Sequence, residues 1–109
     1  MVNDVRLDFE IHWKLNISKV QDDPTNRVLR SLGNKFPYRV FLTPTNEMLC
    51  ERTFDLYDRY YTVETHHLQL DHGQWAISIV DVTGWLDLTV KNVRLNTVRL
   101  PGDTTVFTL

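Results

Sequence analysis

The sequence has few of the residues that build catalytic and cofactor sites. Its 109 residues include one cysteine, four glycines and three serines. A single cysteine, Cys50, excludes an internal disulfide and therefore the small scaffolds that depend on disulfides. None of the serines lies in a G-x-S-x-G turn, and no glycine-rich loop could hold a phosphate group. These absences predict a non-enzymatic protein, and no small-molecule cofactor is implied.

Long apolar runs and an excess of one charge are also missing. No run approaches the ~18 apolar residues of a membrane-spanning helix, and the first residues lack the basic and then apolar pattern of a signal peptide. We therefore expect an intracellular protein. The net charge is −2, from 12 basic and 14 acidic residues, which does not indicate a chain coated with nucleic acid. The hydrophobic content of 42% is typical of a globular protein.

The strongest pattern present is an alternation of apolar and polar residues over positions 5–17. Seven apolar side chains, from Val5 to Ile17, take every second position. A period of two predicts one long β-strand with one buried and one solvated face. Such a strand needs hydrogen-bonded neighbours and a second layer that covers its apolar face.

The rest of the chain predicts more strands and one helix. An acid before Pro24 and a glycine at position 33 predict a short helix over about residues 23–33. The period of residues 86–95 changes at Asn92-Val93, which predicts a bulge there. Further strands are expected over residues 38–43, 48–54, 61–70, 75–82 and 104–109. We therefore predict one β-rich domain, residues 1–109, folded as an antiparallel β-sandwich or flattened barrel of about seven or eight strands with one short α-helix.

The last expected strand is a candidate for assembly. It contains no charged side chain, so it could pair with a second copy of the chain or with another protein if it lies at a sheet edge. The competing interpretation is that it completes the chain's own sheet. The candidate residues are Thr104, Thr105, Val106, Phe107 and Leu109.

Two segments without acids suggest a different partner. If residues 27–39 and 91–99 shared one face, that face would be basic and could bind RNA or an acidic membrane surface. Solvated strand and helix faces are the simpler interpretation. The candidate residues are Arg27, Arg30, Lys35, Arg39, Lys91, Arg94 and Arg99.

A histidine-rich segment, residues 64–72, offers a weaker metal hypothesis. Imidazole and carboxylate are common ligands of zinc, and the candidates here are His66, His67, Asp71 and His72. In a strand, however, His66 and His67 point to opposite faces and cannot share one site without a bulge. A metal-dependent enzyme is therefore the least favoured hypothesis. Cys50 is expected to be a small buried residue and not a reactive thiol.

The function favoured by these patterns is protein interaction or assembly, with self-association through a strand edge. Small β-rich chains of this kind are common among viral and phage structural or accessory proteins. The alternative function is binding to RNA or to an acidic membrane surface through the two basic segments.

Overall fold

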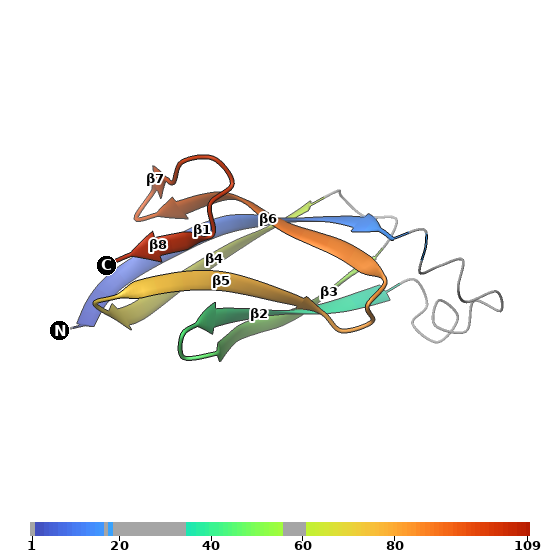
Figure 1. Ribbon diagram of the computed structural model, residues 1–109, viewed down its shortest axis with the longest axis horizontal. Helices are drawn as coiled ribbons and strands as arrows, with labels where there is room; N and C mark the ends of the chain where they lie inside the picture. The colour runs from blue at the N-terminus through green and yellow to red at the C-terminus, as the bar shows by residue number, and fades with distance from the viewer. Residues whose placement is uncertain (1, 17, 19–34, 56–60) are drawn as a thin grey trace.

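The protein is a β-sandwich of two four-stranded antiparallel sheets (Figure 1). The computed structural model describes residues 2–16, 18, 35–55 and 61–109. In chain order, the strands are β1 (Val2–Leu15), β2 (Lys35–Thr43), β3 (Glu47–Asp55), β4 (Tyr61–Asp71), β5 (Gln74–Asp81), β6 (Leu86–Leu95), β7 (Val98–Arg99) and β8 (Val106–Thr108). This architecture confirms the predicted antiparallel sandwich. The helix expected over residues 23–33 lies outside the described residues.

The first sheet has the strand order β4-β1-β6-β7, so the opening strand is central. It pairs with β4 from Val2 to His12 and with β6 from Leu7 to Leu15. The strand begins three residues earlier than the alternation predicts, and Val2 is exposed. Pairing with β4 reaches beyond the part of the strand that needs burial.

The second sheet has the order β3-β2-β5-β8. A tight hairpin joins β2 to β3, and β5 pairs with β2 on one side and with β8 on the other. The edge strands are therefore β4 and β7 in the first sheet and β3 and β8 in the second.

The core lies between the sheets and is built by the period of two. The inward residues of β1 include Leu7 and Ile11, and those of β2 include Phe36 and Val40, all four fully buried. Burying a large apolar side chain contributes about 1.5–3 kcal/mol, which offsets the entropy lost when its backbone is fixed. The layers are thus held mainly by the alternating faces of the two central strands.

The bulge predicted at Asn92-Val93 is present. Asp8 pairs with Arg94 and Glu10 pairs with Lys91, so two residues of β6 lie opposite one residue of β1. Asn92 adopts a φ of 54°, a conformation that asparagine tolerates better than most residues. Its side-chain Nδ2 donates a hydrogen bond of 2.9 Å to Glu10 Oε2, which holds the bulge against β1.

Among the residues that the structure describes, no helix has the length and apolar character needed to cross a membrane.

Candidate functional site

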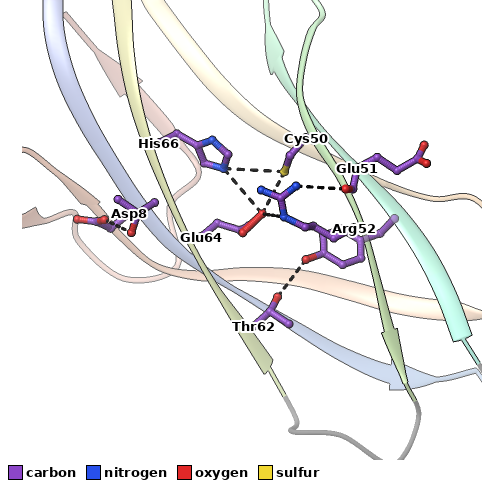
Figure 2. A network of polar contacts seen from close by, with 9 residues as sticks. Asp8, Cys50, Glu51, Arg52, Thr62, Glu64 and His66 are labelled. Carbon is purple, nitrogen blue, oxygen red and sulfur yellow. Dashed lines mark hydrogen bonds and ion pairs between the residues drawn. The ribbon is translucent and has the colours of Figure 1, made fainter.

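A polar cluster lies between the two sheets, where the edge strands β3 and β4 face each other (Figure 2). Alternation on β3 directs Cys50 inward, and alternation on β4 directs Glu64 and His66 inward. Cys50 is 8% exposed and Glu64 is 7% exposed. Among the buried residues that the structure describes, Glu64 is the one charged side chain.

The contacts of the cluster converge on one oxygen, Glu64 Oε1. The Cys50 thiol donates a hydrogen bond to it over 3.0 Å. The Nε of Arg52 lies 3.2 Å from the same oxygen, and His66 Nε2 lies 3.8 Å from it. Cys50 Sγ and His66 Nε2 are 3.9 Å apart. A carboxylate oxygen, a thiol and an imidazole nitrogen therefore meet at one point.

The cluster sets the charges of its members. Burial acts to raise the pKa of Glu64, but contacts with His66, Cys50 and Arg52 outweigh it, so this pKa is lowered. Burial, together with the hydrogen bond to Glu64 and its negative charge, raises the pKa of Cys50 to about 12. At neutral pH, Glu64 is a carboxylate and Cys50 is a neutral thiol.

Neighbouring contacts fix the position of the cluster. The His66 ring stacks on Phe9, with the ring centres 5.9 Å apart and the planes 16° from parallel. Nearby, the hydroxyl groups of Tyr38 and Thr62 form a hydrogen bond of 3.2 Å that also joins the two sheets. The imidazole is thus held from behind by the core, with its Nε2 toward the thiol and the carboxylate.

This arrangement suits ligand binding better than nucleophilic catalysis. A cysteine nucleophile needs a lowered pKa and a base that a third group orients through its other nitrogen. Here the pKa of Cys50 is raised, and His66 turns the same nitrogen, Nε2, toward both Cys50 and Glu64. Sulfur, nitrogen and oxygen donors in close contact are instead the ligand types of zinc-like cations.

The structure separates the four residues of the histidine hypothesis. His66 points into the sandwich, with 13% of its side chain exposed, whereas His67 is exposed on the opposite face of β4. This confirms that the two histidines do not share a face. Asp71 ends β4 and His72 lies in the following turn, and both are exposed.

The first basic segment contributes two described cations to the outer face of the second sheet. Lys35 and Arg39 are exposed on β2, each opposite an acid of β3. Lys35 pairs in register with Asp55, and the Nε of Arg39 lies 2.6 Å from Glu51 Oε2. Arg27 and Arg30 lie outside the described residues.

The second basic segment belongs to the first sheet. Lys91 and Arg94 lie on β6 opposite Glu10 and Asp8, and Arg99 lies on β7 opposite Arg94. Arg94 also helps to lower the pKa of both acids, although burial opposes this effect. The described cations of the two segments therefore lie on different sheets, and four of them lie opposite acidic residues.

The C-terminal strand β8 lies at an edge of the second sheet and pairs with β5 of the same chain. Phe107 points inward and is 4% exposed, while Val106 is 41% exposed. Backbone hydrogen bonds from Ile77 of β5 to Thr105, and between Leu109 and Gly73 just before β5, extend the pairing on both sides of β8. Thr104 is half-buried beside it.

Sequence reasoning missed that Cys50 and Arg52 belong to the same cluster as Glu64 and His66. The signal that could have found it lies in β4, whose inward face is polar at residues 62, 64 and 66 and apolar at Leu68 and Leu70. A charged residue at an inward position requires a partner from the facing layer.

In comparisons with known proteins, no family model, no curated protein and no solved structure matches this chain significantly.

Proposed function

We propose that this chain is a non-enzymatic assembly domain that associates with a second copy of itself through the edge of β8. The observation that carries the proposal is that β8 is an edge strand with no ionisable side chain and with an exposed apolar residue, Val106. Sheet edges pair readily when they present unpaired backbone groups without charges that repel a partner.

The other edges are less suited to self-pairing. In a two-fold dimer, each edge strand meets its own copy, so the charged residues of that strand are brought close to the same charged residues of the partner. β3 carries four charged residues and β4 carries two acids and two histidines. β7 has two residues, one of them Arg99. Of the four edge strands, β8 therefore presents the fewest charges to a second copy.

The backbone of β8 shows which groups are available. Gly73 and Leu109 exchange two hydrogen bonds, and Ile77 donates one to Thr105. Because alternate residues of an antiparallel strand face alternate neighbours, Val106 and Thr108 direct their N–H and C=O groups away from β5. Around a two-fold axis at Phe107, Val106 of one copy would pair with Thr108 of the other. The result would be a sheet that continues from one copy into the next.

The test is the molar mass in solution, measured by light scattering after gel filtration over a series of micromolar to millimolar concentrations. We expect the mass of the wild type to rise toward that of a dimer. Val106→Lys adds a charge beside the axis, and Thr108→Pro removes an outward N–H without breaking a bond to β5. Both variants should stay monomeric.

The matched control is Val63→Lys on β4, where Val63 is 64% exposed and belongs to the other sheet. It adds the same charge without touching β8 and should associate like the wild type. A wild type that stays monomeric throughout the series would overturn the proposal. So would an equal loss of association in Val63→Lys.

A further inference from the structure

The strongest unassigned feature of the molecule is the set formed by Cys50, Glu64 and His66. Among the described residues, these three offer ligand atoms that all lie within 4.8 Å of one another. Glu64 and His66 share one face of β4, whereas Cys50 comes from β3 of the other sheet, so no local sequence motif brings Cys50 to the other two. Figure 2 shows the three side chains directed at one point between the sheets.

We propose that Cys50 Sγ, Glu64 Oε1 and His66 Nε2 bind one zinc-like divalent cation, which links β3 to β4 across the sandwich. This proposal does not depend on the assembly role of β8. It names a site that the histidine segment, residues 64–72, does not contain alone, because Cys50 lies on another strand. Glu64 lies in that segment but is not one of the four candidate residues of the histidine hypothesis.

The distances between the ligand atoms support this assignment. Zinc bonds of about 2.3 Å to sulfur and 2.0–2.2 Å to nitrogen or oxygen place tetrahedral ligand atoms about 3.4–3.6 Å apart. The observed separations are 3.0 Å for sulfur and oxygen, 3.9 Å for sulfur and nitrogen, and 3.8 Å for nitrogen and oxygen. Shifts of a few tenths of an ångström, within side-chain freedom, would bring all three to one metal ion.

The charge balance also suits a divalent cation. Binding replaces the hydrogen bond between Cys50 and Glu64 by a sulfur–metal bond, and the thiol proton leaves to solvent. The thiolate and the carboxylate then carry two negative charges, which the cation neutralises. Arg52 now contacts Glu64 Oε1, but its side chain is 49% exposed and can turn outward. The fourth position, on the side of Arg52, would hold a water molecule.

The neighbours of the histidine favour binding through Nε2. The ring of His66 is stacked on Phe9, which fixes its plane, and Nε2 already faces the other two ligands. An imidazole that is held in this orientation loses little freedom when it binds a metal. Exposed His67 and His72 are free of this constraint and serve as internal controls.

The experiment uses the whole chain, freed of metal with a chelator and titrated with Co²⁺ and Zn²⁺. We expect one Co²⁺ per chain, with a near-ultraviolet charge-transfer band from a cobalt–thiolate bond, and displacement of that band by Zn²⁺. Zn²⁺ should also raise the urea midpoint, because a ligand that binds the folded state stabilises it. The proposal is overturned if the wild type takes up no more Co²⁺ or Zn²⁺ than background.

Variants locate the site. Removing an outer partner of a metal ligand costs about 10- to 100-fold in affinity, so Cys50→Ser, Glu64→Gln and His66→Gln should each cost at least as much. Cys50→Ser should also abolish the charge-transfer band. His67→Gln, one residue along the strand on the opposite face, should bind like the wild type. Circular dichroism checks that each variant is folded. If a variant is not folded, the Co²⁺ absorption spectrum of the wild type still shows whether a thiolate binds the metal. The assignment is contradicted if His67→Gln loses metal binding, or if His66→Gln binds the metal as tightly as the wild type.

Discussion

The two margins of the sandwich differ in strand length and in what lies between the sheets. At the β3/β4 margin, two long edge strands enclose the polar contacts of Cys50, Glu64, His66 and Arg52. At the β7/β8 margin, the edge strands have two and three residues, and an apolar side chain, Phe107, closes the core. Inward-pointing charges and short edge strands are both known ways of discouraging unwanted strand pairing. The long edge strands β3 and β4 are therefore protected from strand pairing by an inward-pointing charged cluster. At β8, the described residues offer only the shortness of the strand as protection.

The largest expected effect tests the apolar margin. Phe107→Ala should lower the free energy of unfolding by about 3–5 kcal/mol, because it removes a large buried ring and leaves a cavity. Val106→Ala, on the same strand but 41% exposed, is the matched control and should cost far less. Urea denaturation at low protein concentration measures both. Equal costs for the two variants would mean that β8 does not close the core.

The next effect tests the polar margin. Glu64→Gln keeps the size and one acceptor oxygen but removes the charge, so it should cost about 1–2 kcal/mol, since hydrogen bonds to charged groups are the stronger ones. The comparison variant is Glu51→Gln, whose ion pair with Arg39 is about half-exposed at both ends. It should change the free energy of unfolding by under about 1 kcal/mol. The urea midpoints of the two metal-free variants would contradict the contrast if they were equal.

A smaller effect is expected next to the cluster. Tyr38→Phe removes the hydroxyl that bonds to Thr62 across the sheets and should cost about 0.5–1.5 kcal/mol. The ring itself stays buried, so no large cavity forms. Thermal unfolding followed by circular dichroism measures the loss. A variant as stable as the wild type would show that the bond between the sheets contributes nothing at this margin.

The smallest effect tests whether a carboxylate other than the buried Glu64 makes the stability of the fold depend on acid pH. Glu10 lies on the outer face of the first sheet. Burial acts to raise its pKa, but hydrogen bonds from His12 and Asn92 outweigh this effect, so the pKa lies below its ordinary 4.5. A lowered pKa in the folded state gives stability that is present above pH 4.5 and is lost as the pH falls through the folded value. Glu10→Gln should therefore flatten the loss of stability between pH 5 and pH 3 by under about 1 kcal/mol. If urea denaturation gives the same pH profile for Glu10→Gln and the wild type, Glu10 does not contribute to the loss of stability at acid pH.

Much of the fold could be predicted from the sequence because period-two alternation is a local property. The alternation from Val5 onward identified β1, and the change of phase at Asn92 identified the bulge. Strand order was not predictable, because nothing local shows that β1 lies between β4 and β6. The predicted helix over residues 23–33 lies outside the described residues.

The candidate site was harder to predict than the fold. Alternation separated His66 from His67, as the structure confirms. It could not show that Cys50 faces Glu64, because that contact depends on how two sheets stack and not on the order of residues in either strand. For the same reason, the sequence could not show that the described cations of the two basic segments lie on different sheets.

The central place of β1 has a consequence for folding. Leu7 pairs with Leu95, so β1 cannot complete its hydrogen bonding until β6, a strand distant from it in the sequence, is in place. Pairings between such distant residues slow folding, because a long loop must close before any contact rewards it. Until then, the side of β1 that receives β6 presents backbone N–H and C=O groups without their partners.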